Sequence, residues 1–284
     1  MDESRLLIVG ANGQLGLALK AKYPKAKTTD INNLDISDKK SVDSYDWKSV
    51  DIILNAAAYT NVDEAETGEG RIIAWKVNTE GISNLVSVAL ENNLILIHIS
   101  SEYVFDGSKS LHLESEPVSP LGVYGQTKAA ADIIVKILPK HYLIRTSWVI
   151  GEGKNFVRTM LALGQKGVEP TVVNDQIGRL TFTSELVRAI DHLITNNLDY
   201  GIYNLSNSGE PSSWANITRE IFKLANFKLS VKEISTAEYF IDKNGSAPRP
   251  MNSTLSLDKI QSTKFHSRDW LEDLKIYINK EKTT

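Results

Sequence analysis

A glycine-punctuated turn near the N-terminus constrains the fold more than any other feature of the chain. The turn, Gly10-Ala-Asn-Gly-Gln-Leu-Gly16, follows an apolar run, Leu6–Val9, that predicts a buried strand, and it opens a helical pattern that reaches Lys22. A strand, a glycine turn and a helix in this order are typical of dinucleotide sites, where the backbone and the helix N-terminus hold a pyrophosphate. The spacing is G-x-x-G-x-x-G instead of G-x-G-x-x-G, so a tight strand-to-helix connection is an equally open interpretation.

The rest of the first half alternates apolar runs with helical patterns. Strands are predicted over 28–30, 51–55, 94–99 and 142–145, with helices over 77–90 and around Tyr124. This alternation predicts an α/β fold with a Rossmann-type, doubly wound parallel sheet. We expect residues 1–150 to form the dinucleotide-binding domain, to which later segments could return. Residues 151–284 are then mainly a smaller α/β substrate-binding region.

In that second region the rhythm is looser. Helices are predicted over 183–194, 213–224 and 269–279, short strands over 203–205 and 231–234, and a loop from Lys243 to Pro250. We expect this region to pack against the carboxyl ends of the first sheet, where open α/β sheets bind ligands.

Composition excludes several classes of function. The chain has 284 residues, a net charge of −3 and no cysteine, so thiolate metal sites and a cysteine nucleophile are absent. No basic stripe suggests nucleic acid, and the five histidines show no metal-ligand spacing. The first residues lack a basic signal-peptide start, and no apolar run approaches the ~18 residues of a membrane span. We therefore expect a cytoplasmic protein without metal, membrane or nucleic-acid partners.

Three further features favour a dinucleotide. Asp30 ends the second predicted strand, 20 residues after Gly10, where a carboxylate can bind a ribose 2′-hydroxyl; a loop or cap role is the alternative. This position favours NADH over NADPH. Asp35 and Ile36 would lie along the adenine, although Asp35 could equally be a turn residue. The small side chains of Ala56–Ala58 would let the cofactor approach the third strand, or serve close packing alone.

Tyr124 and Lys128 predict the chemistry. They are four residues apart, so on a helix they share a face, and the ammonium can stabilise a phenolate and lower the phenol pKa. Such a phenol can protonate a carbonyl oxygen while a hydride reaches the carbon. Ser101, at the end of the fourth predicted strand, could share that oxygen, whereas a lone serine there is otherwise a turn residue. His98, inside the same apolar strand, is predicted to be a hydrogen-bonded core residue.

Several motifs now occur in one order along nearly the whole chain. They are Gly10-Ala-Asn-Gly-Gln-Leu-Gly16, Asn55-Ala-Ala-Ala-Tyr-Thr-Asn-Val-Asp63, Tyr103-Val-Phe-Asp-Gly107, Tyr124-Gly-Gln-Thr-Lys128, Arg145-Thr-Ser-Trp148, Asn155-Phe156, Asn174-Asp-Gln176 and Arg249-Pro-Met-Asn-Ser253. In these the chain resembles the dTDP-4-dehydrorhamnose reductase family of the extended short-chain dehydrogenase/reductase superfamily. The Tyr-x-x-x-Lys pair specifies only the superfamily. More specific are the motifs Tyr103-Val-Phe-Asp-Gly107, Arg145-Thr-Ser-Trp148, Asn155-Phe156 and Asn174-Asp-Gln176.

The resemblance implies roles for particular residues. Ser101, Tyr124 and Lys128 would be the catalytic triad. With the glycine turn, the expected cofactor site is Gly10, Asn12, Gly13, Gln14, Leu15, Gly16, Asp30, Asp35, Ile36, Ala56, Ala57, Ala58, Tyr124 and Lys128. The expected substrate site is Ser101, Glu102, Tyr103, Tyr124 and Trp148 at the deoxysugar, with Asn155, Phe156 and Arg249 at the nucleotide end. The planar fork of an arginine suits a diphosphate.

The implied activity is the NAD(P)H-dependent reduction of the C4 ketone of dTDP-4-dehydro-L-rhamnose to dTDP-L-rhamnose, by a monomer or homodimer. Two departures bear on it: Ser100-Ser101-Glu102 stands where the family usually has Ser-Thr-Asp, and Arg179-Leu180-Thr181 lacks a usual proline. They leave two alternatives open. One is a related nucleotide-sugar reductase or epimerase-reductase making another 6-deoxyhexose, and the other is a non-catalytic regulatory subunit with the same fold.

Overall fold

The computed structural model describes residues 2–243 and 245–283. Its strands are β1 (Leu6–Val9), β2 (Lys27–Thr29), β3 (Ile52–Asn55), β4 (Ile95–Ser101), β5 (His141–Thr146), β6 (Val149–Ile150), β7 (Thr171–Val173), β8 (Ile177–Gly178), β9 (Thr181–Phe182), β10 (Gly201–Asn204), β11 (Ser212–Ser213) and β12 (Lys232–Ile234). Its α-helices are α1 (Gln14–Lys22), α2 (Lys39–Ser44), α3 (Gly68–Trp75), α4 (Gly81–Glu91), α5 (Val123–Val135), α6 (Phe156–Gln165), α7 (Thr183–Thr195), α8 (Trp214–Ala225), α9 (Thr236–Phe240), α10 (Asp258–Ser262) and α11 (Trp270–Thr283).

A six-stranded parallel sheet, in the order β10-β5-β4-β3-β1-β2, forms the larger part of the molecule. From β1 the chain moves outward to β2 and then crosses back to β3 on the other side of β1. In register, Val9 faces Asn55 and Asn55 faces His98, so the carboxyl ends of these strands lie along one edge. In such sheets the crevice at this edge, where the strand order reverses, is the usual ligand site.

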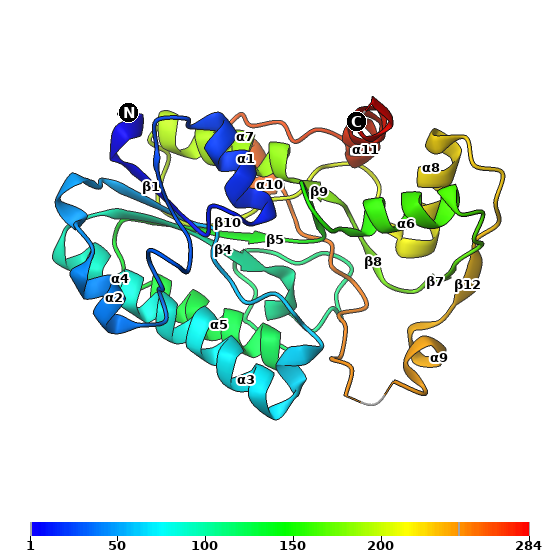
Figure 1. Cartoon of the computed structure of the whole chain (residues 1–284), viewed down its shortest axis with the longest axis horizontal. Coiled ribbons are helices and arrows are strands. Elements are labelled where there is room, and N and C mark those ends of the chain that lie inside the picture. The colour runs from blue at the N-terminus through cyan, green and yellow to red at the C-terminus, as the bar shows by residue number, and fades with distance from the viewer. Residues whose placement is uncertain (1, 244, 284) are drawn as a thin grey trace.

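Helices cover both faces of the sheet (Figure 1). Leu6 and Ile8 of β1 point to the face covered by α1 and α7, whereas Leu7 and Val9 point to the face covered by α2, α4 and α5. Successive side chains of a strand alternate between faces, and here both faces are buried, which explains why the strands are apolar throughout. The predicted fold class, a Rossmann-type parallel sheet, is confirmed.

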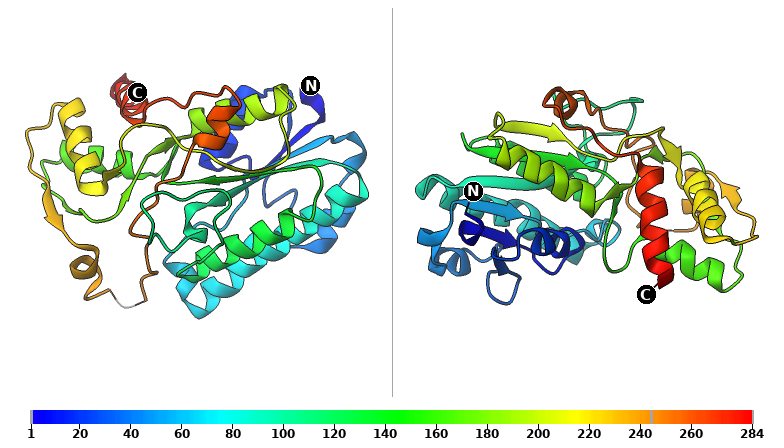
Figure 2. Two further views of the ribbon diagram at one scale, coloured as in Figure 1. Left: turned by 180° about the vertical axis from the view of Figure 1, so that it is seen from behind. Right: turned by 90° about the horizontal axis from the view of Figure 1, so that it is seen from above.

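A smaller region lies beyond the carboxyl edge of the sheet. Its core contains α6, α8 and α11, and β7 pairs with β12 beside them. Viewed from above in Figure 2, the red helix α11 lies between the sheet and α8. Two elements from the second half of the chain belong to the larger sheet region instead. Helix α7 packs against α1, and β10 pairs with β5. A domain boundary at residue 150 stays a prediction.

The structure differs from the predicted elements in places that sequence periodicity does not mark. The helix expected over 77–90 begins as a π-helical turn, Lys76–Glu80, which joins α3 to α4. The side chain of Asn78 in this turn bonds both the N–H and the C=O of Tyr59, and this contact across the fold accounts for the local widening. Helix α6 was not predicted. The predicted loop from Lys243 to Pro250 includes residue 244, which lies outside the described residues.

The described residues contain neither a membrane-spanning helix nor a metal-binding cluster. None of their helices combines the length and the apolar composition that crossing a bilayer requires. Among the same residues, no three His, Cys, Asp or Glu side chains form a group able to hold a metal ion.

Candidate active site

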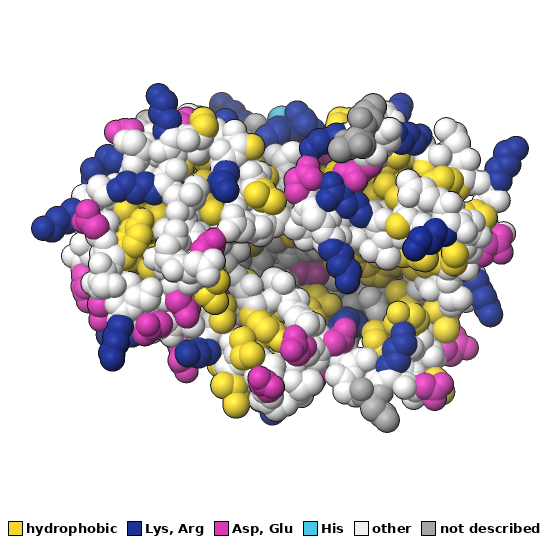
Figure 3. Space-filling model, viewed as in Figure 1, with side chains coloured by type: hydrophobic (Ala, Val, Ile, Leu, Met, Phe, Trp, Pro, Cys, Tyr) yellow, Lys and Arg dark blue, Asp and Glu magenta, His cyan; other side chains and the backbone are white. Residues whose placement is uncertain are grey.

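A cavity of about 510 Å³ lies at the carboxyl edge of the sheet. Figure 3 shows the molecule hollowed near the centre of this face. The cavity is lined by Gly13, Gln14, Leu15, Ala56, Ala57, Ala58, Thr60, Val62, Ile99, Ser100, Ser101, Glu102, Tyr103, Tyr124, Lys128, Thr146, Ser147, Trp148, Val149 and Leu186. Most of these residues lie at the carboxyl ends of β3, β4 and β5 or just after them, or they belong to the glycine turn. The structure thus brings the predicted catalytic residues together with the central part of the predicted cofactor site.

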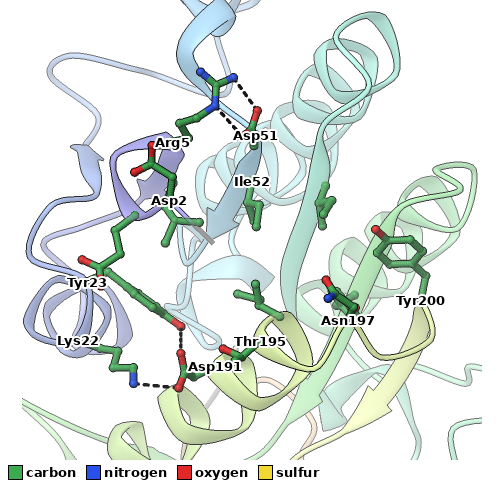
Figure 4. Close-up of a pocket in the computed structure, with 15 residues that line it drawn as sticks. Asp2, Arg5, Lys22, Tyr23, Asp51, Ile52, Asp191, Thr195, Asn197 and Tyr200 are labelled. Atoms are coloured by element: carbon green, nitrogen blue, oxygen red, sulfur yellow. Dashed lines mark hydrogen bonds and ion pairs between the residues drawn. The ribbon is translucent and has the colours of Figure 1, made fainter.

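Another hollow, of about 540 Å³, lies at the opposite, amino edge of the sheet, beside the first residues of β1, β3 and β4 (Figure 4). Four of its six charged side chains pair with one another. Arg5 contacts both carboxylate oxygens of Asp51, and Asp191 pairs with Lys22 at 2.8 Å and accepts a hydrogen bond of 2.9 Å from Tyr23. Because these groups already satisfy one another, the carboxyl edge is the better candidate site.

The glycine turn fits a pyrophosphate. Gly10 has φ +76°, and a Cβ there would lie 2.5 Å from the backbone nitrogen of Ala57, so only glycine allows this close approach of β1 and β3. Gly13 occupies the N-cap of α1, where, among the described residues, no side chain accepts a bond from the first turn. The first N–H groups of a helix that no side chain caps suit an anion.

The expected ribose and adenine residues lie outside the cavity lining. Asp30 follows β2 and accepts hydrogen bonds from the side chain of Asn12 and, at 2.9 Å, from the N–H of Asn32. Asp35 accepts from the N–H and hydroxyl of Ser37, as a turn residue does, and Ile36 is buried. Asn12 and Asp30 therefore meet at the mouth of the glycine turn. The cofactor roles of Asp30, Asp35 and Ile36 stay predictions.

The candidate catalytic serine is held by its neighbours. Ser101 Oγ donates a hydrogen bond of 2.7 Å to Glu102 Oε2 and accepts one of 3.2 Å from the N–H of Tyr103. The ring of Tyr103 meets that of Tyr124 edge to face, with centroids 5.4 Å apart. Burial raises the pKa of Glu102 to about 7, and the bond from Ser101 acts in the opposite direction. The cavity thus contains a carboxyl group that changes charge near neutrality.

The expected lowering of the Tyr124 pKa is not found. Burial raises the pKa of this phenol, the charge of Glu102 raises it further, and a hydrogen bond with Ser101 lowers it. The reason lies in the direction of Lys128. Its Nζ donates a hydrogen bond of 2.7 Å to the C=O of Ile99 and lies 3.3 Å from His98 Nε2, so the ammonium points at β4. Burial lowers the pKa of Lys128 to about 8, against the charge of Asp132.

Trp148 lines the cavity, and its neighbour Trp214 lines a second hollow beside it. Trp148 has φ +44°, which is unusual for a bulky residue and common at functional sites. In this conformation the indole stacks on Trp214, with ring centroids 3.7 Å apart. A Cβ on Gly178 would lie 2.9 Å from the Trp148 ring, so glycine is needed there too. Trp148 thus lines the cavity beside Trp214, and its contact with the sugar stays a prediction.

The neighbouring hollow, of about 460 Å³, contains two of the three residues expected at the nucleotide end. It is lined by Asp63, Phe156, Met160, Thr171, Val172, Val173, Gln176, Trp214, Tyr239, Phe240, Lys243, Ser246 and Arg249. Arg249 contacts both carboxylate oxygens of Asp63 at 2.8 Å. Asn155 lines neither hollow: it caps α6 and donates hydrogen bonds to Gly151 O and Tyr277 Oη. Its observed contacts are structural, and a ligand contact stays a prediction.

Sequence reasoning missed residues whose position depends on distant segments. Trp214 opens a predicted helix, and nothing local distinguishes it from a packing residue. Asn78 bonds Tyr59 and, at 3.1 Å, the hydroxyl of Thr127, thereby linking the loop after β3 to the helix that carries Tyr124. His98 is hydrogen-bonded and buried as predicted, but its second ring nitrogen faces Lys128. Only the packing of α5 against β4 reveals this contact.

Known proteins resemble the chain over nearly its whole length. A family model described as the RmlD substrate binding domain matches residues 4–283. A dTDP-4-dehydrorhamnose reductase from Aggregatibacter actinomycetemcomitans is 38% identical, over 96% of this chain and 97% of the relative. A dTDP-4-keto-6-deoxy-D-glucose reductase from Streptomyces niveus is 36% identical, over 78% of each. The crystal structure of a dTDP-4-dehydrorhamnose reductase from Bacillus anthracis in complex with NADP superposes with a TM-score of 0.89 at 34% identity, covering 97% of this chain and 99% of that one.

Proposed function

This chain belongs to the dTDP-4-dehydrorhamnose reductase family, and we propose that it reduces the C4 ketone of dTDP-4-dehydro-L-rhamnose to dTDP-L-rhamnose with a nicotinamide cofactor. One observation carries the proposal: Ser101, Tyr124 and Lys128 line the same cavity as Gly13 and Ala57 of the candidate cofactor site. A proton donor and a hydride source can therefore meet at one carbonyl group.

The proton comes from Tyr124 in this proposal. The raised pKa of the ligand-free phenol keeps it protonated near neutral pH, so it holds the proton that a ketone oxygen needs as it becomes an alkoxide. Ser101 lies close enough to share that oxygen, provided that its hydroxyl turns from Glu102. Lys128, one helical turn from Tyr124, would bind the ribose of the cofactor. The nicotinamide, when bound, supplies the hydride.

The cofactor is held by the glycine turn and by small residues. The N-terminus of α1 receives the pyrophosphate, and Ala56–Ala58 allow the close approach that Gly10 also requires. We propose that NADH is used at least as well as NADPH, because Asp30 can accept a hydrogen bond from a ribose 2′-hydroxyl but repels a 2′-phosphate. The Bacillus anthracis relative binds NADP, so this preference is a property to be tested in this chain.

The substrate extends from the cavity into the neighbouring hollow. Trp148 offers an aromatic face at the sugar, and Phe156 and Trp214, whose ring centroids are 4.3 Å apart, offer apolar surface for the base. Arg249 lies at the hollow, and its planar fork suits the diphosphate. In this arrangement Asp63 holds Arg249 in place until the diphosphate arrives.

A second candidate is the reduction of a related 4-keto-6-deoxy sugar nucleotide. The similarity to the Streptomyces niveus reductase favours it, as does Glu102 in place of the usual aspartate beside the sugar. Oxidation of NADH or NADPH, followed in the presence of each of a panel of dTDP-4-keto sugars, separates the two. We expect the highest kcat/KM with dTDP-4-dehydro-L-rhamnose. Higher kcat/KM with another sugar would favour the second candidate, and no oxidation with any sugar would favour a non-catalytic protein.

A further inference from the structure

A row of hydrogen bonds runs beneath the cavity from the loop after β3 to Lys128. The N–H of Ala57 donates to Asn55 Oδ1 at 3.1 Å, Asn55 Nδ2 lies 3.0 Å from His98 Nδ1, and His98 Nε2 lies 3.3 Å from Lys128 Nζ. The side chains are buried: Asn55, His98 and Lys128 are 1%, 0% and 1% exposed. The register of β3 and β4 sets the contact, because Asn55 and His98 are paired residues.

The direction of each bond follows from its first donor. A backbone N–H can only donate, so the Asn55 atom that faces Ala57 is the carbonyl oxygen, and the atom that faces His98 is the NH₂ group. His98 Nδ1 must then accept. Burial lowers the pKa of His98 well below its usual value, so the ring is neutral. A neutral imidazole whose Nδ1 accepts carries its proton on Nε2.

That proton points at Lys128. An ammonium group has three donors and no acceptor, so it cannot accept from His98 Nε2–H, whereas a neutral amine can. The contact therefore favours the amine. We propose that Asn55 and His98 are positioning residues, which hold the imidazole in its Nε2–H tautomer and thereby favour release of a proton from Lys128. The catalytic consequence rests on the proposed function.

The consequence is a supply of protons to Tyr124. When Tyr124 has protonated the substrate oxygen, a phenolate remains. Nζ of Lys128 then turns from Ile99 O toward Tyr124, an Nζ–H bond breaks as the Tyr124 O–H bond forms again, and the amine takes a proton from solvent. The pKa of Lys128 near 8 suits this transfer. Besides His98 on β4, the charge that acts on Lys128 is that of Asp132, one turn further along α5, which favours the ammonium.

Two variants separate the tautomer from other effects. In Asn55→Asp, one carboxylate oxygen still accepts from Ala57, and the other now accepts from His98, so the ring proton should move to Nδ1 and Nε2 should become an acceptor for the ammonium. His98→Leu removes the donor and adds no charge. Asn92→Asp, at an exposed position at the end of α4, is the control for an added carboxylate.

The test uses NMR of the whole chain labelled with [¹⁵N]histidine and [¹³Cε]lysine, with signals assigned through His98→Leu and Lys128→Met. We expect Nε2–H for His98 in the unmodified chain and Nδ1–H in Asn55→Asp. The titration midpoint of Lys128 should rise by about one pH unit in both Asn55→Asp and His98→Leu, and not in Asn92→Asp.

Three results would overturn the proposal: an Nδ1–H tautomer in the unmodified chain, no change of tautomer in Asn55→Asp, or a Lys128 midpoint that moves in Asn55→Asp alone, which would reflect added charge. If His98→Leu does not fold, His98→Gln assigns the signal in its place, and the tautomer in Asn55→Asp decides. The measurement needs no substrate, so a failure of the proposed reaction would be seen separately, in the turnover assay.

Discussion

The hydroxyl of Ser101 donates a 2.7 Å hydrogen bond to the carboxylate of Glu102. Glu102 is buried, and this burial raises its pKa to about 7. The candidate catalytic serine is therefore bound to a group that changes charge in the range where enzymes work. The family usually has aspartate at this position, so the properties of Glu102 are not expected in most relatives.

Glu102 should make the ligand-free protein less stable as pH rises. The native pKa, about 7, exceeds the usual 4.5, so between these values the native state binds more protons than the unfolded state. The stabilisation is fully present below about pH 4.5 and is lost as pH rises through 7, by roughly 3 kcal/mol. Glu102→Gln cannot titrate. Urea unfolding at pH 5 and pH 8 should show a larger loss for the unmodified chain than for Glu102→Gln; equal losses would contradict the raised pKa.

Tyr124→Phe should fold normally and lose most reductase activity. The phenol supplies the proton, and general acid catalysis is typically worth about 10²–10⁴-fold in rate. Steady-state kcat with the keto sugar and cofactor measures the loss, while near-unchanged cofactor binding shows that the cavity is intact. Tyr45→Phe, at a tyrosine that packs on Trp47 away from the cavity, is the matched control. Near-native kcat in the Tyr124 variant would reject its role as proton donor.

Trp148→Ala should raise KM for the sugar nucleotide by about three- to ten-fold, and KM for the cofactor much less. The substitution removes an aromatic face from the cavity and its stack on Trp214, and aromatic pairs are worth about 0.5–1.5 kcal/mol. Trp148→Phe keeps an aromatic ring, so its KM for the sugar nucleotide should lie between those of the unmodified chain and Trp148→Ala. A large fall in melting temperature with unaltered KM would instead make Trp148 a core residue and leave sugar recognition to Ser101, Glu102 and Tyr103.

Asp30 should set cofactor preference. We expect kcat/KM with NADH to equal or exceed that with NADPH, because the carboxylate repels a 2′-phosphate. Asp30→Asn removes the charge but keeps an acceptor, so it should improve kcat/KM with NADPH relative to NADH. Lys39, which could have offset the charge, is paired with Asp43 at 2.8 Å. A ten-fold or greater preference for NADPH in the unmodified chain would show that Asp30 does not face the ribose.

Features that depend on neighbours along the chain could be predicted from sequence. The glycine turn requires only a strand before it and a helix after it, and four-residue spacing on one helix places Tyr124 near Lys128. The position of Ser101 near the site could be predicted because parallel strands end at a common edge of the sheet. These local relationships are why the predicted fold class is confirmed and why the predicted catalytic side chains line one cavity.

Features that depend on pairing between distant segments could not be predicted. The return of β10 to β5 joins residues about 60 apart, and the π-helical turn at Asn78 depends on contacts with Tyr59 and Thr127. The prediction of a lowered pKa for Tyr124 was wrong for the same reason. Spacing placed the ammonium on the correct face of α5, but Ile99 and His98 on β4 determine where it points.

We propose that this chain delivers a hydride to C4 of a dTDP-4-keto-6-deoxy sugar. The most direct measurement uses dTDP-4-dehydro-L-rhamnose with a nicotinamide cofactor that carries deuterium at its C4 position, followed by NMR of the isolated product. We predict dTDP-L-rhamnose with deuterium at C4 of the sugar. Unchanged keto sugar, or deuterium at any other carbon, would contradict the proposed reaction.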